Sequence, residues 1–189
     1  MKIILASGSP RRRELLDMLG LKYNIQPAKG EEKADPSLPP DKLVRALAEA
    51  KALEVAAQNP SDDLVIAADT IVWHDGCVLG KPRDEADAFR MLRSLSGKTH
   101  EVYTGVTTVQ SGKVDTQVEC TRVRFRELSD EEIRAYIATK EPMDKAGAYG
   151  AQGYASLFVE KLEGDFFNVM GLPLCALGNL LKQLGVNLL

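Results

Sequence analysis

The stretch Ile3-Ile4-Leu5-Ala6-Ser7-Gly8-Ser9-Pro10-Arg11-Arg12-Arg13-Glu14-Leu15 decides how the chain begins to fold. Its short apolar run predicts a strand over residues 2–6, and a helical pattern begins at Pro10, a residue that suits the first helical position. Ser9 suits the N-cap, where its side-chain oxygen accepts a backbone N–H. The stretch therefore predicts a strand–turn–helix unit, the building block of α/β folds.

The turn in this unit combines hydroxyl and guanidinium groups. A helix N-terminus presents free N–H groups and the positive end of the helix dipole, and arginines placed there favour phosphate binding. The alternative is a solvated basic first turn, and spacing alone does not choose between the two. The ending of a Walker loop is absent. Ser7 and Ser9 also have the chemistry of nucleophiles, but no base stands near them in sequence, so phosphate binding is the favoured role.

A second apolar run, Leu64-Val65-Ile66-Ala67-Ala68, predicts a strand that is covered on both faces. It leads into Asp69 and Thr70, and the carboxyl ends of such strands are where α/β proteins place their chemistry. Both residues are also common in turns. Because residues 71–73 continue in an extended pattern, a functional role is favoured. Asp69 then suits either a general base or a metal ligand, and the sequence leaves both open.

Strands and helices alternate along the rest of the chain, which predicts an α/β domain with a mixed sheet. The remaining predicted helices cover residues 41–58 (capped by Asp41), 84–95 (capped by Asp84), 129–139 (with a Ser129–Glu132 capping box) and 173–184, and the remaining strands cover 102–109, 114–126 and 154–160. Residues 26–40 form the long irregular stretch, and such loops are often functional.

Three features allow both a structural and a functional interpretation. Lys51 falls on the apolar stripe of its helix, so its ammonium either escapes to water or points into a cleft. Arg122, Arg124 and Arg126 alternate along one strand face, which favours a solvated face over a nucleic-acid-binding stripe. The glycines of residues 144–153 allow either tight turns or close approach to a ligand.

Composition excludes several classes of protein. The 189 residues carry a net charge of −3, which argues against nucleic acid as a partner. No apolar run approaches the length of a membrane span, and the first one is too short for a signal peptide. Three widely spaced cysteines indicate a reducing, cytoplasmic environment, and two histidines do not predict a histidine-rich zinc site. Basic and acidic loop residues together suit a phosphorylated ligand with a divalent cation, for which Mg²⁺ is expected.

Several motifs, in order and over essentially the whole chain, resemble the Maf family of nucleoside triphosphate pyrophosphatases. They are Ser7–Arg12, Gly30–Glu32, Glu49–Ala52, Ala68–Val72, Gly80–Pro82, Leu95–His100, Asp144–Gly153 and Val169–Pro173. The resemblance implies a single two-lobed domain over residues 1–189. It also implies an elongated mixed sheet flanked by helices, with a central cleft similar to that of inosine triphosphatase. The implied reaction releases pyrophosphate from a nucleotide with the help of a divalent cation: Mg²⁺, or alternatively Mn²⁺ or Co²⁺. A homodimer is also expected.

The resemblance assigns roles to individual residues. Asp69 corresponds to the proton acceptor, with Lys51 and Lys81 as further catalytic residues. The implied substrate-binding residues are Ser7, Arg11, Arg12, Thr70 and Gln152, and the implied metal ligands are Glu32 and Asp69. The Ala68-Asp69-Thr70 form is similar to the branch acting on dTTP and UTP, and the Gln152 amide has the donor and acceptor needed to read a pyrimidine edge. Modified pyrimidine nucleotides are further expected substrates. Ala151 departs from the larger aliphatic residue that relatives often carry. The alternative function is a non-catalytic nucleotide-binding regulator of cell division.

Overall fold

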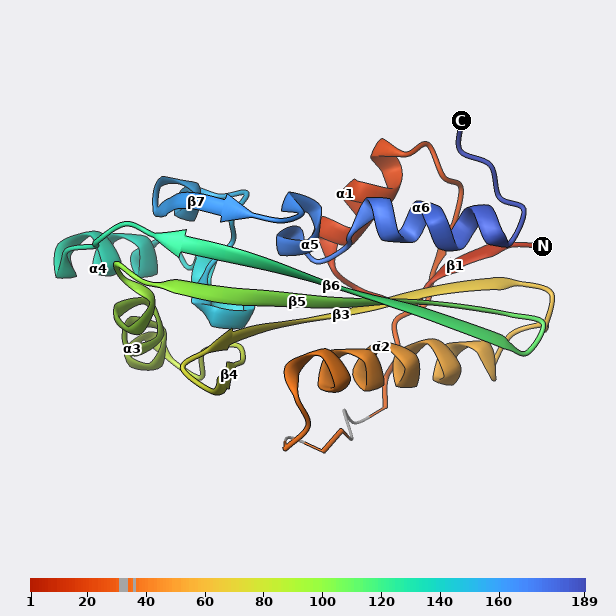
Figure 1. Ribbon diagram of the computed structural model, residues 1–189, viewed down its shortest axis with the longest axis horizontal. Coiled ribbons are helices and arrows are strands. Elements are labelled where there is room, and N and C mark those ends of the chain that lie inside the picture. Colours follow the sequence, from red (N-terminus) through yellow and green to blue (C-terminus); the bar gives the residue numbers. More distant parts are fainter. Residues whose placement is uncertain (31–33, 36) are drawn as a thin grey trace. The chain divides into compact units, whose positions relative to one another are not determined.

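The computed structural model describes residues 1–30, 34–35 and 37–189, which adopt a mixed α/β fold (Figure 1). Its seven-stranded sheet has the order β2-β1-β3-β5-β6-β7, with β4 paired to β3. The strands are β1 (Ile3–Leu5), β2 (Asn24–Ile25), β3 (Leu64–His74), β4 (Cys77–Leu79), β5 (Thr99–Gln110), β6 (Lys113–Phe125) and β7 (Val159–Glu163). The predicted metal ligand Glu32 lies outside the described residues.

Helices flank the sheet. The α-helices are α1 (Pro10–Met18), α2 (Pro40–Ala56), α3 (Glu85–Leu95), α4 (Asp130–Ala138), α5 (Phe166–Met170) and α6 (Leu174–Gln183), and the 3₁₀ helices are η1 (Glu141–Asp144), η2 (Ala146–Ala148) and η3 (Tyr154–Leu157). No helix among the described residues has the length and apolar character needed to cross a membrane.

The chain divides into two compact units. The first contains Met1–Asp69, Thr104–Glu119 and Gly171–Leu189, and the second contains Thr70–Tyr103 and Cys120–Met170. Strands β3, β5 and β6 contribute residues to both units.

In the first unit, strand β1 pairs in parallel with β2 and β3. Helix α2 covers one face of this part of the sheet, and α1 and α6 lie on the other (Figure 1). The side chains of Ala52 and Val55 in α2 pack against Val65 and Ala67 of β3. Successive strand residues point to opposite faces, so Asp69 shares the α2 face with Val65 and Ala67.

The core of the second unit is built around Phe125, which is fully buried. Its ring packs edge-to-face against Tyr149 at 4.8 Å and against His100 at 5.1 Å between ring centroids. The hydroxyl of Tyr149 lies 2.7 Å from Nε2 of His100. Burial lowers the pKa of His100 to about 3, so its ring is neutral at pH 7.

Most predicted elements are confirmed, and two helix starts differ from expectation. Ser9 occupies the N-cap of α1 in an extended conformation, but its side chain makes no capping hydrogen bond. The predicted cap at Asp41 is also wrong, because α2 begins at Pro40 and its N-cap is Pro39. Proline is well suited to the first helical position, and Asp41 instead lies in the first turn, where the helix dipole favours a carboxylate.

The strand predicted over residues 154–160 is also displaced. Residues 154–157 form η3, and β7 begins only at Val159. Ala155 and Phe158 are buried, while Tyr154 and Leu157 are exposed. This spacing of three between buried residues fits a 3₁₀ turn and not the alternation of a strand.

Candidate functional site

The turn between β1 and α1 is organised by Ser7 and Arg12. The buried Ser7 hydroxyl accepts hydrogen bonds from the backbone N–H of Ser9 at 3.2 Å and from Nη1 of Arg12 at 3.1 Å. Nε of Arg12 donates to the carbonyl of Gly171 at 2.7 Å. The guanidinium therefore joins the first turn of α1 to the segment before α6, and it holds a donor-rich group at the start of a helix. Arg11, beside it, is half-buried.

The second feature of the first unit is an ion pair between Lys51 and Asp69. Lys51 comes from α2, and Asp69 is the last residue of the β3 segment in this unit. Both side chains are largely shielded from solvent, with 23% of Lys51 and 11% of Asp69 exposed. The Lys51 ammonium thus pairs with Asp69 and does not extend freely into water.

The parallel pairing of β1 with β3 relates the positions of these two features along the sheet. Leu5 pairs with Ile66, and the backbone N–H of Ala6 donates to the carbonyl of Ile66 at 2.8 Å. Ser7 follows Leu5 by two residues, and Asp69 follows Ile66 by three. A hydroxyl and a guanidinium thus follow the end of β1, and a carboxylate, paired with an ammonium from α2, lies within the neighbouring strand β3, three residues beyond the partner of Leu5. Such a set can bind phosphate oxygens and accept a proton.

In the second unit, Lys81 is exposed, and hydrogen bonds hold the chain before and after it. The carbonyl of Gly80 accepts a hydrogen bond from the N–H of Gly147 at 3.0 Å. The N–H of Arg83 donates to the carboxylate of Asp87 at 3.0 Å. This backbone bond between Gly80 and Gly147 brings the Lys81 segment against the glycine-rich segment 144–153.

Gln152 lies in that glycine-rich segment. The N–H of Gly153 donates to the carbonyl of Gly150 at 3.0 Å, which closes a turn with Ala151 and Gln152 at its centre. Ala151 is buried and Gln152 is exposed. Thr70, the other predicted specificity residue in this unit, is half-buried and directly follows Asp69.

Sequence reasoning missed Glu141 and Tyr136, which contact this turn. Their partners are backbone N–H groups, so no pattern of side chains in the sequence marks them. The available signal was the pair of glycines at 150 and 153, because glycine often marks a place where another group approaches the backbone closely.

The arginine-bearing face of β6 is a face of ion pairs. Arg122 pairs with Glu163 at 3.5 Å, and Arg124 pairs with Glu160 at 2.7 Å. Arg122 and Arg124 line a pocket of about 220 Å³ together with Thr99, Lys161 and Glu163. Because both arginines are exposed and paired with carboxylates, the structure supports the solvated-face interpretation for Arg122 and Arg124.

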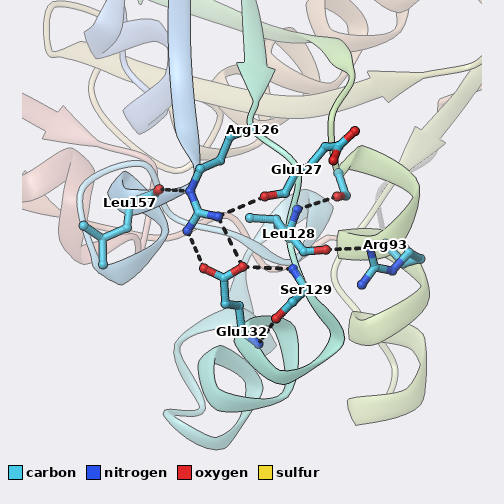
Figure 2. Close-up of polar contacts among 8 residues, drawn as sticks. Arg93, Arg126, Glu127, Leu128, Ser129, Glu132 and Leu157 are labelled. Carbon is cyan, nitrogen blue, oxygen red and sulfur yellow. Dashed lines mark hydrogen bonds and ion pairs between the residues drawn. The ribbon is translucent and has the colours of Figure 1, made fainter.

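Arg126 makes a different set of contacts. Its guanidinium donates to both carboxylate oxygens of Glu132, at 2.6 and 3.2 Å, and to the carbonyls of Glu127 and Leu157 (Figure 2). The predicted capping box is present here, with the Ser129 hydroxyl accepting from the N–H of Glu132. Arg126 is therefore a structural residue that joins the start of α4 to the end of η3.

A divalent cation has a limited set of protein ligands here. Within the described ranges, no group of three or more His, Cys, Asp or Glu side chains is arranged to hold a metal ion. Asp69 offers carboxylate oxygens of the type that Mg²⁺ prefers, and Mg²⁺ commonly takes its other ligands from substrate phosphates and water. Asp69 thus offers one carboxylate of the kind that such a cation takes from a protein.

Comparison with known proteins extends over nearly the full chain. A relative from Bacillus cereus, named dTTP/UTP pyrophosphatase, is 51% identical over 186 residues, covering 98% of this chain and 97% of the relative. A protein of the same name from Bacillus thuringiensis subsp. konkukian is 50% identical, with the same coverage of both chains.

A solved nucleoside-triphosphatase / dITP/XTP pyrophosphatase from Mycobacterium abscessus shares 15% identity, with a TM-score of 0.43. The alignment covers 68% of this chain and 76% of that one, and this similarity is too low to inform the site. The sequence profile described as Maf-like protein matches residues 2–184. The chain therefore belongs to the Maf-like protein family.

Proposed function

We propose that this protein is a nucleoside triphosphate pyrophosphatase that hydrolyses dTTP and UTP to the monophosphate and pyrophosphate. The observation that carries the proposal is the 51% identity, across 98% of the chain, to a relative of that name. The names of these relatives are those of enzymes, which favours catalysis over a non-catalytic nucleotide-binding regulator. Modified pyrimidine nucleotides are further candidate substrates.

In the proposed reaction, water attacks the α-phosphorus. Asp69 accepts the proton of the attacking water, the new P–O bond forms, and the bond from the α-phosphorus to the bridging oxygen breaks, so that pyrophosphate leaves. Lys51, paired with Asp69, orients that carboxylate and balances its charge. Ser7, Arg11 and Arg12 bind phosphate oxygens, for which a guanidinium is well suited.

The residues of the second unit keep the roles that the family resemblance implies. Lys81 is proposed to support catalysis through the phosphates, and Thr70 and Gln152 are proposed to select the base. The amide of Gln152 offers one donor and one acceptor side, which is what the edge of uracil or thymine requires.

A divalent cation, with Mg²⁺ as first choice and Mn²⁺ or Co²⁺ as alternatives, completes the proposal. Asp69 would hold it together with substrate oxygens, and the cation would neutralise charge on the triphosphate. Glu32 remains a proposed ligand outside the described residues. We also propose a single domain over residues 1–189, a cytoplasmic location and a homodimer.

A nucleotide panel tests the proposed function. Purified protein with Mg²⁺ is offered dTTP, UTP, CTP, dATP, GTP and 7-methyl-GTP, and the release of pyrophosphate and of inorganic phosphate is measured separately. The expected result is release of pyrophosphate, greatest from dTTP and UTP. Release of single phosphates would refute the proposed bond cleavage, and tight nucleotide binding without any hydrolysis would favour the regulator.

A further inference from the structure

The turn that carries Gln152 is held at its start by Tyr136 and at its end by Glu141. At its start, the N–H of Gly150 donates to the hydroxyl oxygen of Tyr136 at 3.2 Å. At its end, the N–H of Tyr154 donates to Oε2 of Glu141 at 3.1 Å. The Tyr136 hydroxyl in turn donates to Oε1 of Glu141 at 2.9 Å. Both ends of the turn thus converge on one carboxylate.

The backbone of the turn lies directly against that carboxylate. A Cβ atom placed on Gly153 would stand 2.2 Å from Oε1 of Glu141 and 2.4 Å from its Cδ and Oε2. A side chain at position 153 would therefore displace the Glu141 carboxylate from its present place. The turn therefore has close steric contact with Glu141 as well as hydrogen bonds to it.

The groups that hold the turn are themselves fixed. Tyr136 lies one helical turn after Glu132 in α4, and the start of α4 is bound by Arg126 (Figure 2). Nε of Arg126 also donates to the carbonyl of Leu157 at 2.9 Å, at the end of the segment that follows the turn. Residues 150–157 are thus held to α4 at both ends.

We propose that Glu141 is a positioning residue for base selection: through the Tyr136 hydroxyl and the Tyr154 N–H, it fixes the turn that presents Gln152. This inference rests on the proposed function, in which Gln152 reads the base. In this role Glu141 acts on the base through the backbone of the turn and not through its own contact with the substrate.

The test uses Glu141→Gln, which keeps the shape of the side chain and replaces one acceptor oxygen with an NH₂ donor. An NH₂ that faces the Tyr154 N–H sets two donors against each other, and an NH₂ that faces Tyr136 removes the acceptor to which that hydroxyl donates. Glu160→Gln is the matched control, because it removes the same charge from an exposed carboxylate whose ion pair is with Arg124, on the solvated face of β6. Tyr136→Phe removes the hydroxyl and keeps the ring, and it provides a second variant if the first does not fold.

Two measurements are made on each variant. The ratio of kcat/KM for dTTP to that for dGTP is expected to fall about tenfold in Glu141→Gln and Tyr136→Phe, because a displaced amide loses a hydrogen bond that distinguishes the bases. Hydrogen exchange at the amides of Gly150 and Tyr154, followed by NMR without nucleotide, is expected to become faster. Glu160→Gln is expected to leave both values unchanged.

The outcomes separate this inference from the proposed function. If the wild-type protein is active but the ratio of kcat/KM for dTTP to that for dGTP is unchanged in both Glu141→Gln and Tyr136→Phe, the positioning role is refuted. This holds even if hydrogen exchange in the turn becomes faster. Unchanged exchange at both amides refutes it as well. A wild-type protein that releases no pyrophosphate from any nucleotide refutes the proposed function, and the inference falls with it.

Discussion

Replacing Asp69 with Asn tests the central chemical step. Asn keeps the size of the side chain, and its amide oxygen still accepts a hydrogen bond from Lys51, but it cannot take a proton from water. A positioned general base contributes at least ~100-fold to the rate. The variant is therefore expected to lose at least ~100-fold in turnover of dTTP, equivalent to about 2.7 kcal/mol of activation free energy.

The effect of the same change on stability is expected to be much smaller. Asp69 and Lys51 are both shielded from solvent, and the substitution exchanges a charge-assisted hydrogen bond for an ordinary one, a loss of about 1 kcal/mol. For a chain of this size the melting temperature should fall by about 2–4 °C. A loss of that size leaves nearly all of a protein of ordinary stability folded at 25 °C, so unfolding cannot account for the loss of turnover.

Asp63→Asn is the matched control. Asp63 stands just before the same strand, has the same whole-residue exposure as Asp69 (8%), and accepts a hydrogen bond from the N–H of Lys2 at 2.7 Å. The assay is pyrophosphate release from dTTP with Mg²⁺, with thermal unfolding measured in parallel. Normal turnover by Asp69→Asn would remove this residue from the mechanism, and an equal loss in Asp63→Asn would show that the effect is not specific to position 69.

Three further predictions concern other parts of the molecule. Arg12→Lys is expected to raise the KM for dTTP about tenfold with little change in kcat. The reason is that an ammonium group cannot donate to the Ser7 hydroxyl and also bind a phosphate through two parallel hydrogen bonds, as a guanidinium can. An unchanged KM in steady-state kinetics would contradict this. Gln152→Ala is expected to change the preference among bases more than it changes inhibition by pyrophosphate, and equal losses on every nucleotide would exclude base reading. Hydrogen bonds from Arg126, and next from the backbone N–H of Ser129, lower the pKa of Glu132 to about 2. The stability that ionised Glu132 contributes to the fold is therefore complete above about pH 4.5 and disappears as the pH falls towards 2. The difference in melting temperature between wild type and Glu132→Gln should therefore shrink across that range, and a difference independent of pH would count against the assignment.

Elements with strong local signals could be predicted from sequence. The apolar run at 64–68 indicated a buried strand, and the caps at Asp84 and Ser129 are present as hydrogen bonds to Asp87 and Glu132. The strand predicted at 154–160 failed because its apolar residues suggested extension, whereas burial follows a spacing of three. Local composition does not reveal which of those residues face a core.

Candidate site residues could be chosen from the sequence, but their contacts could not. Asp69 could be chosen because it follows a buried apolar run, yet its pairing with Lys51 depends on how α2 packs on β3, which is a tertiary contact. The contacts of Glu141 could not be predicted from the sequence for a different reason. The Glu141 carboxylate accepts from a backbone N–H 13 residues away, and every sequence has such groups.

The packing of α2 on β3 also limits how this stretch can diverge. Asp69 meets Lys51 because it stands an even number of residues after Val65 and Ala67, which fix the strand against the helix. Inserting or deleting one residue between positions 65 and 69 would turn the carboxylate to the opposite side of the sheet. Over evolutionary time this stretch should accept amino-acid replacements but not single-residue changes in length, and a designer of variants should keep its spacing intact.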